Sequence, residues 1–231
     1  MTFDLKDHFI KAIKIQPNFS EAHLQLALIY QQEGSNKKAT AHFQFAISAD
    51  ENEIKKLEKY GNELMQNSQF QNAKKQFIKS EQKRHHCSLV YYKLALHFIE
   101  ISENELAQDA LQNSIDKSPK AAKAYRELGL LLLNNNNLDA ARFHLEKSID
   151  IDYSDSKSHF LLGNIMVRMN DLNDAEQEYL SAMDINLKYT ECKIEMAFLQ
   201  IKMGDLKKAK KYYLEAQEID PKVYDQKLEV L

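Results

Sequence analysis

The side chains best suited to chemistry lie near the middle of the sequence, where His85, His86 and Cys87 are adjacent. Imidazole and thiolate groups bind transition metals and also serve as bases or nucleophiles. Neighbouring residues in one turn rarely converge on a single metal ion, and no CxxC or Cys/His ligand spacing occurs elsewhere. We therefore predict no metal site and no cofactor, and we expect Cys87 and Cys192 to be free thiols in a reducing compartment.

Other catalytic patterns are missing from the sequence. It contains no glycine-rich phosphate loop, no G-x-S-x-G elbow and no HExxH helix. Paired carboxylates occur, but on segments this rich in charge they are typical of a solvated surface. His23 and His159 recur at one aromatic packing position, which predicts core or half-buried residues. We expect that the protein is not an enzyme.

The charge balance argues against a protein that coats nucleic acid. The 231 residues include 31 basic and 34 acidic side chains, a formal net charge of −3, whereas nucleic-acid binding needs a clear basic excess. One basic run, at residues 207–211, could contact nucleic acid or anionic lipid. Glu215 and Glu218 follow it closely, which favours a solvated outer helix.

The hydropathy of the chain indicates a soluble protein. Asp4, Lys6 and Asp7 interrupt the first residues before the apolar core of a signal peptide could form. The longest apolar run, Leu128 to Leu133, is far shorter than the ~20 residues of a membrane-spanning helix. We expect a cytoplasmic location. A longer natural protein with an upstream anchor stays open as an alternative.

An alanine recurs every 34 residues through six consecutive periods. Four residues after each alanine stands a bulky side chain, and seven residues after it stands another small one. These spacings lie on one face of an α-helix, so each period is predicted to carry a helix with a small, large, small stripe. The recurring alanines are Ala39, Ala73, Ala107, Ala141, Ala175 and Ala209.

A second helix is predicted upstream of each of these alanines. Twelve residues before the alanine the residue is always alanine or glycine, and an apolar or aromatic residue precedes it. Two helices approach closely only where their side chains are short, so each period should form a helical hairpin. These small residues are Ala27, Gly61, Ala95, Gly129, Gly163 and Ala197.

Turn residues separate the predicted helices. Within each period one residue is glycine, asparagine or serine, and glycine and asparagine tolerate the left-handed conformation that ends a helix. Pro17, Pro119 and Pro221 mark turns between periods, because proline readily starts a new helix. The turn residues within the periods are Gly34, Ser68, Ser102, Asn136, Asn170 and Gly204.

The repeat resembles the tetratricopeptide repeat, whose pattern is W-x2-L-G-x2-Y, A-x3-F and P. The resemblance implies an all-α fold, a right-handed superhelical solenoid of stacked hairpins in which the first helix of each hairpin lines a concave face. Glu51, His85, Tyr153 and Leu187 stand where the family often has proline, and we expect no change of fold from these departures. The matching residues are Pro119, Tyr125, Leu128, Gly129, Leu132, Ala141 and Leu145.

The register divides the chain into one predicted repeat domain, residues 1–231. The N-terminal helix, Phe3 to Ile15, lacks a hairpin partner. It would pack inward as a cap, be covered by a second copy, or follow a missing part of a longer protein. The predicted segments are an incomplete repeat at 3–19, full repeats at 20–53, 54–87, 88–121, 122–155, 156–189 and 190–223, and a short cap at 224–231.

The resemblance also implies that the first helices line a binding groove. Their residues pass from basic to apolar along the chain, which fits an acidic partner segment with apolar anchors. Glu58 and Glu127 interrupt the basic end, and an ordinary solvated face is the alternative. The predicted groove residues are Lys55, Lys59, Asn62, Tyr92, Lys93, Lys123, Arg126, Leu130, Phe160, Asn164, Arg168 and Phe198.

The predicted function is therefore that of a protein–protein interaction scaffold or adaptor. Its partner would be a protein or peptide, with no nucleic acid and no membrane span. The alternative is a self-associating assembly or regulatory module of a larger complex, which would associate through the incomplete first repeat. The carboxylate clamp of tetratricopeptide cochaperones is predicted to be absent, because Glu58 and Phe160 stand where its first lysine belongs.

Overall fold

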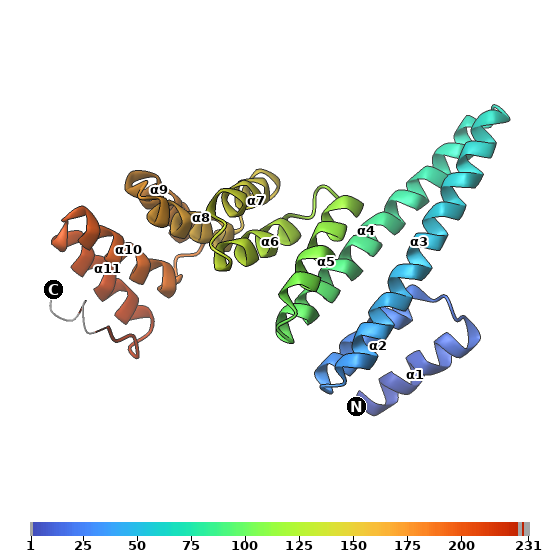
Figure 1. Ribbon diagram of the computed structural model, residues 1–231, viewed down its shortest axis with the longest axis horizontal. Coiled ribbons are helices and arrows are strands. Elements are labelled where there is room, and N and C mark those ends of the chain that lie inside the picture. The colour runs from blue at the N-terminus through green and yellow to red at the C-terminus, as the bar shows by residue number, and fades with distance from the viewer. Residues whose placement is uncertain (1, 226–227, 229–231) are drawn as a thin grey trace. The chain divides into compact units, whose positions relative to one another are not determined.

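The computed structural model describes residues 2–225 and residue 228, and for residues 2–4 it describes the backbone alone. This part of the chain is helical and contains no strand, which confirms the predicted all-α fold. The helices are α1 (Thr2–Ile15), α2 (Ser20–Gln32), α3 (Asn36–Gln66), α4 (Phe70–Glu100), α5 (Asn104–Lys117), α6 (Ala122–Asn134), α7 (Leu138–Ile151), α8 (Ser156–Met169), α9 (Leu172–Ile185), α10 (Thr190–Met203) and α11 (Leu206–Ile219) (Figure 1).

The chain divides into two compact units, residues 1–124 and residues 125–231. In the first unit α1 packs on α2, α2 on α3, α3 on α4 and α4 on α5. In the second unit α7 packs on α8, α8 on α9, α9 on α10 and α10 on α11. Each unit therefore places sequence neighbours side by side, as expected for a helical repeat protein.

All six turns predicted within the periods are confirmed. Each of these residues has a positive φ, between 57° at Ser68 and 86° at Gly204. At the first turn the N–H of Ser35 donates to the carbonyl of Tyr30 at 2.8 Å, which satisfies a carbonyl at the end of α2. The left-handed residue therefore ends one helix and allows the next to fold back.

The predicted close approach at the small residues is also confirmed. A Cβ atom built on Gly163 would lie 2.5 Å from the ring of Tyr179, and one on Gly129 would lie 2.7 Å from Cγ of Leu145. Tyr179 and Leu145 are both buried. Glycine thus lets the two helices of a hairpin reach contact distance, and the bulky residue of the second helix fills the space.

The expectation of turns near Glu51 and His85 is wrong, because both residues lie inside uninterrupted helices of 31 residues. The turns near Tyr153 and Leu187 do form without proline. There Asp152 Oδ1 accepts a hydrogen bond from the N–H of Ser154 at 3.1 Å, and Asn186 Oδ1 accepts one from the N–H of Lys188 at 3.2 Å. Such side-chain turns stop a helix.

The two missing turns lack this device. Asp50 is the equivalent of Asp152, but its carboxylate is taken up by His86 and Lys83 of α4, at 2.6 and 3.1 Å. Arg84 occupies the same position in the next period, and a guanidinium has no acceptor atom. With neither proline nor a side-chain turn, α3 and α4 each run through a predicted repeat boundary.

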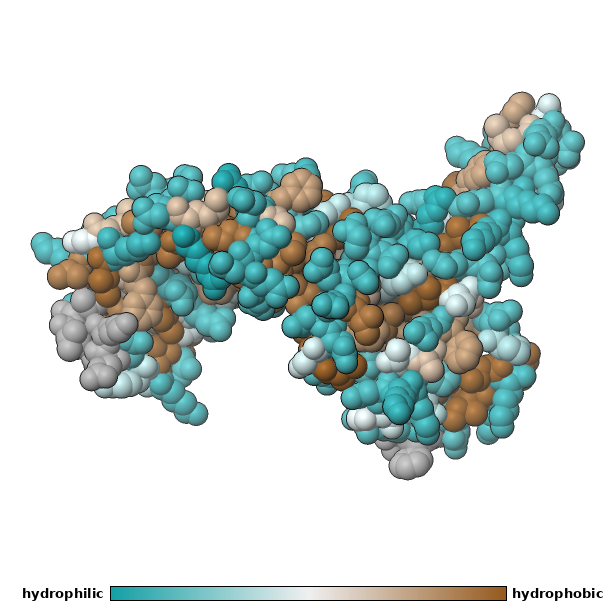
Figure 2. All heavy atoms as spheres, viewed as in Figure 1, coloured by the Kyte–Doolittle hydropathy of each residue, from teal (hydrophilic) through white to brown (hydrophobic). Residues whose placement is uncertain are grey.

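The outcome is a long antiparallel hairpin whose outer end projects from the first unit (Figure 1). We call residues 54–84 the arm. Its two helices pack through Gly61 of α3, where a built Cβ would lie 2.8 Å from the ring of Phe77 of α4. Figure 2 shows mostly hydrophilic side chains along the visible face of the arm, with a paler apolar patch at its tip.

The first helix and the last described residue each pack on the neighbouring repeat. Lys6 of α1 donates to Glu33 at 2.6 and 2.8 Å, and its ammonium lies 4.3 Å from the ring centroid of Tyr30. At the other end Leu228 is buried with Ala197 and Tyr213. The predicted C-terminal cap also includes Val230 and Leu231, which lie outside the described residues.

Candidate protein-binding surfaces

The arm carries the first group of predicted groove residues, Lys55, Lys59 and Asn62. All three are exposed on the outer half of α3. The arm has eight basic and three acidic side chains, whereas the whole chain has a net charge of −3. Positive charge is therefore concentrated on this projection, which favours acidic ligands at its surface.

The next predicted residues, Tyr92 and Lys93, lie on the inner half of α4 and are half-buried. The Lys93 ammonium is 5.9 Å from the ring centroid of Tyr92. Lys59 lies level with the part of α4 near Ser80, since Ser80 hydrogen-bonds Glu58 at 3.0 Å. At 1.5 Å per residue, the level of Lys93 is roughly 20 Å further along α4. The structure therefore does not bring Lys59 and Lys93 together.

Two more basic residues of the predicted groove differ in environment. Lys123 is exposed at the start of α6. Arg126 is bound by two carboxylates, with Nη1 2.8 Å from Asp155 and Nη2 2.9 Å from Glu127. Burial lowers the pKa of the Arg126 guanidinium, but hydrogen bonds to Glu127 and Asp155 outweigh this and raise it. The charge of Arg126 is thus already neutralised within the protein.

The second unit holds the apolar group of predicted groove residues. Phe160 on α8 is half-buried, with its ring centroid 5.0 Å from that of Tyr189 and 5.9 Å from that of Tyr179. Leu130 on α6 and Phe198 on α10 are also half-buried. Phe198 packs against the C-terminal cluster around Leu228. These side chains form part of the packing and still present area to solvent.

The polar residues of this group hold the helices together. Asn164 Oδ1 accepts a hydrogen bond from the hydroxyl of Tyr179 at 2.6 Å. Arg168 donates to the backbone carbonyl of Leu133 at 3.2 Å and is otherwise exposed. Both residues therefore have structural contacts, and any binding by them stays a prediction, as it does for the other groove residues.

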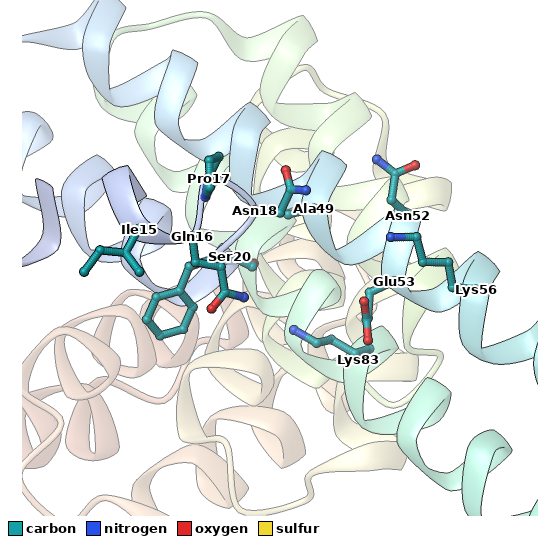
Figure 3. Close-up of a pocket in the computed structure, with 11 residues that line it drawn as sticks. Ile15, Gln16, Pro17, Asn18, Ser20, Ala49, Asn52, Glu53, Lys56 and Lys83 are labelled. Carbon is teal, nitrogen blue, oxygen red and sulfur yellow. The ribbon is translucent and has the colours of Figure 1, made fainter. Parts of the chain in front are cut away.

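A hollow at the base of the arm was not foreseen from the sequence. We call it the elbow pocket, and it has a volume of about 550 Å³. Residues of the turn between α1 and α2 form one side, α3 contributes Asn52, Glu53 and Lys56, and Lys83 reaches in from α4 (Figure 3). Its apolar lining includes Ile15 and Phe19, which are 86% and 41% exposed.

A cluster of charges lies beside the elbow pocket. Asp50 is fully buried, and the two ring nitrogens of His86 lie 2.6 Å from Asp50 and 2.8 Å from Glu21. Because both nitrogens face carboxylate oxygens, both must donate. The hydrogen bond to Asp50 raises the pKa of His86 above its usual value despite burial. The cluster links α2, α3 and α4 where the arm begins.

The two cysteines, and the two histidines predicted at one aromatic packing position, are buried in the packing. Within the described residues no group of three or more potential ligands could hold a metal ion. Both predicted free thiols are confirmed, and burial raises the pKa of Cys87 and of Cys192 to about 12. His23 and His159 are buried, as predicted. His159 is 2.7 Å from Glu178 and 3.1 Å from the carbonyl of Tyr153.

Comparison with protein families identifies the repeat. Models described as the tetratricopeptide repeat match residues 20–53, 92–156 and 191–223, which together make up more than half of the chain. The chain belongs to the tetratricopeptide repeat family. No curated protein sequence matches it. The matched segments leave out the arm, in keeping with the unusual continuation of α3 and α4.

Solved tetratricopeptide structures share the fold at low sequence identity. YrrB, described as a tetratricopeptide protein with an unusual peptide-binding site, has a TM-score of 0.66 and 14% identity over 96% of this chain and 95% of its own. MamA has a TM-score of 0.64 and 16% identity over 88% and 92%. PilF of Pseudomonas aeruginosa has a TM-score of 0.54 and 17% identity over 88% and 93%. These likenesses establish the fold alone.

The family assignment makes a protein or peptide the expected kind of partner for this tetratricopeptide protein. Within the described residues no helix combines the length and apolar character needed to cross a membrane. The cytoplasmic location stays a prediction, as do the repeat boundaries other than the two that α3 and α4 run through.

Proposed function

We propose that the chain is a non-catalytic scaffold that binds a segment of a partner protein on the first helices of its tetratricopeptide repeats. The observation that carries this proposal is the set of half-buried apolar side chains in the second unit, Leu130, Phe160 and Phe198. They lie on α6, α8 and α10, the first helices of three successive repeats. Partly exposed aromatic and aliphatic residues on a rigid surface are suitable anchors for a partner.

The partner segment is proposed to combine apolar anchors with acidic residues. Apolar side chains would contact Phe160 and its neighbours in the second unit. Acidic side chains would be attracted to the basic residues of the first unit, Lys55, Lys59, Lys93 and Lys123, wherever the partner contacts that unit. Exposed lysines contribute more to the rate and orientation of association than to affinity. Because Arg126 is already paired with Glu127 and Asp155, it is expected to add little.

A peptide library with varied acidic and apolar positions, immobilised as an array, tests this proposal. The native chain is compared with the double variant Leu130→Ser and Phe160→Ser. The control is Leu187→Ser with Leu214→Ser, which removes two leucines that are 75% and 47% exposed elsewhere in the same unit. Circular dichroism and thermal melting establish that both variants are folded.

The expected result is at least a tenfold loss of affinity in the first variant for the peptides that the native chain selects, since a buried anchor contributes ~1.4 kcal/mol or more. The control variant should bind as the native chain does. If no peptide is selected, or if the folded Leu130→Ser and Phe160→Ser variant binds the selected peptides with unchanged affinity, the proposal is wrong.

A further inference from the structure

The arm exposes a helix face that every other repeat buries. Tyr60 is 52% exposed, whereas the residues at the same repeat position are between 0% and 5% exposed. The uninterrupted helices α3 and α4 leave Tyr60 exposed at this position. The equivalent residues are Leu26, Leu94, Leu128, Leu162 and Met196.

Charged residues flank Tyr60 on the same face. Lys56 lies four residues before it and Glu63 three residues after it, and both are exposed. In the other repeats the position of Lys56 is occupied by Ala22, Val90, Ala124, Ser158 and Cys192, all buried. Charges at such positions would be costly in a stacked hairpin. The arm therefore carries, on the face of Tyr60, charged residues that suit a solvent-exposed surface.

The order of these residues makes the face complementary to itself. An antiparallel copy of the helix, related by a twofold axis next to Tyr60, would place Lys56 opposite the Glu63 of the second copy and Glu63 opposite its Lys56. The two Tyr60 rings would meet at the axis. A twofold interface needs this property, because each residue pairs with a different residue of the same surface.

The elbow pocket lies on the continuation of this face. Ala49, Asn52, Glu53 and Lys56 line the pocket, and their spacing of three and four residues leads on to Tyr60 and Glu63. An arm that lies antiparallel along the face therefore brings its tip to the level of the pocket of the other copy.

The tip has the chemistry to occupy that pocket. Phe70 is 59% exposed at the turn that joins α3 and α4. Residues 66–69, just before it, carry no charge. The pocket offers the exposed apolar surface of Ile15 and Phe19. Burial of these side chains in two symmetric contacts would supply the hydrophobic contribution to association.

We propose that a second copy of this chain docks along the face of Lys56, Tyr60 and Glu63, with the two arms antiparallel and each tip in the elbow pocket of the other copy. The central ion pairs set the register, because a shifted register or a reversed charge would place like charges opposite one another in the contact. The arms also carry lysines on other faces, and their mutual repulsion is limited to about 8 Å at ~0.15 M salt. The dimer is expected to be reversible.

Sedimentation velocity of the full chain at physiological salt, from about 1 μM to a few hundred μM, measures this association. The native chain should pass from monomer to dimer as concentration rises. Lys56→Glu and Glu63→Lys should each stay monomeric, because each places two pairs of like charges opposite one another. An equimolar mixture of the two variants should form a heterodimer, because opposite charges face each other again.

The matched control is Lys55→Glu, which changes the net charge equally on the neighbouring residue. Lys55 lines a different hollow, with Glu51, Glu58 and Arg84, and the variant should dimerise like the native chain. A native chain that stays monomeric at every concentration overturns the proposal. So does a Lys56→Glu variant that still dimerises, a mixture that stays monomeric, or a Lys55→Glu variant that loses the dimer.

Discussion

His97 of α4 packs against Phe43 of α3, with their ring centroids 5.9 Å apart. The repeat register assigns this place to Glu63, which occupies in the second repeat the position that His97 occupies in the third. His97 and Phe43 are both fully buried, whereas Glu63 is exposed on the arm. Burying the carboxylate of Glu63 in an apolar core at this place would be costly. The repeat register predicts that the α3 segment around Glu63 packs against the first repeat. In the structure the inner half of α4, around His97, packs there instead.

Proline at the repeat boundaries should distinguish continuous helices from true turns. Glu51→Pro should lower the free energy of unfolding by ~3 kcal/mol, because proline in a helix interior removes a hydrogen bond and clashes with the preceding turn. Leu187→Pro should change it by less than ~1 kcal/mol. The residue before Leu187, Asn186, has φ −123° and ψ 91°, close to the −144° and 99° of Ser118 before the native Pro119.

Urea denaturation of both variants measures this difference. Circular dichroism at the same time reports whether helix content falls in Glu51→Pro. If Glu51→Pro is as stable as Leu187→Pro, α3 does not run through the boundary in solution, and the arm described above does not exist.

Alanine substitutions at two equivalent glycines should have different effects. A Cβ at Gly163 meets the buried ring of Tyr179, which is also held by its hydrogen bond to Asn164. Gly163→Ala should therefore destabilise the chain by ~1–3 kcal/mol through overpacking. At Gly61 the contact is with Phe77, which is half-exposed on the arm and free to shift. Gly61→Ala should be neutral, or stabilising by up to ~1 kcal/mol.

Thermal melting under identical conditions compares the two alanine variants. We expect Gly61→Ala to melt at or above the temperature of the native chain and Gly163→Ala to melt below it. The reverse order would contradict the packing described for both hairpins.

The charge cluster at the base of the arm should make stability depend on pH. The pKa of His86 is raised in the folded chain, so its contribution is complete below the usual imidazole pKa of about 6.5 and is lost as pH rises through the folded value. The pKa of Asp50 is lowered, although burial alone would raise it, because His86 hydrogen-bonds the carboxylate. Its contribution is present above the usual pKa near 4 and is lost on acidification.

His86→Gln isolates the histidine contribution. The native chain should exceed the variant in free energy of unfolding at pH 6, and this difference should shrink by pH 9. Asp50→Asn should cost ~1.5–3 kcal/mol at pH 6, because it removes the charge to which His86 and Lys83 donate. Denaturant titrations across this pH range measure both effects, and a difference for His86→Gln that grows with pH would refute the assigned role.

The hairpins of the fold could be predicted because each depends on residues close together in the chain. A left-handed turn residue such as Asn170, and a glycine such as Gly163 facing a ring sixteen residues later, act within one period. The absence of proline at Glu51 and His85 does not by itself predict the continuous helices. Tyr153 and Leu187 also lack proline and do have turns, which the side-chain acceptors of Asp152 and Asn186 stabilise. Arg84 has no such acceptor, but Asp50 has one, and its contacts with His86 and Lys83 in the folded chain keep it from forming the turn.

The helices that carry the predicted groove residues could be predicted in part. The register correctly places Leu130, Phe160 and Phe198 on first helices of successive repeats. It could not show that Lys59 and Lys93 lie far apart along the first unit, because that follows from the continuous helices. Lys56 stands where the other repeats have small or apolar residues, and Glu63 stands where they have aliphatic residues or His97. These two charges were the available signal for an exposed arm.

The sequence by itself determined the period, the two helices of each hairpin, the place of each turn within a period and the family. These features arise from backbone preferences and from side-chain size over one helical hairpin. Only the tertiary structure decided which repeats stack on which. That choice depends on whether His97 or Glu63 is buried against Phe43, and on the contacts that Asp50 makes with His86 and Lys83. Such contacts join residues more than thirty positions apart, and their desolvation and hydrogen bonding outweigh local preference.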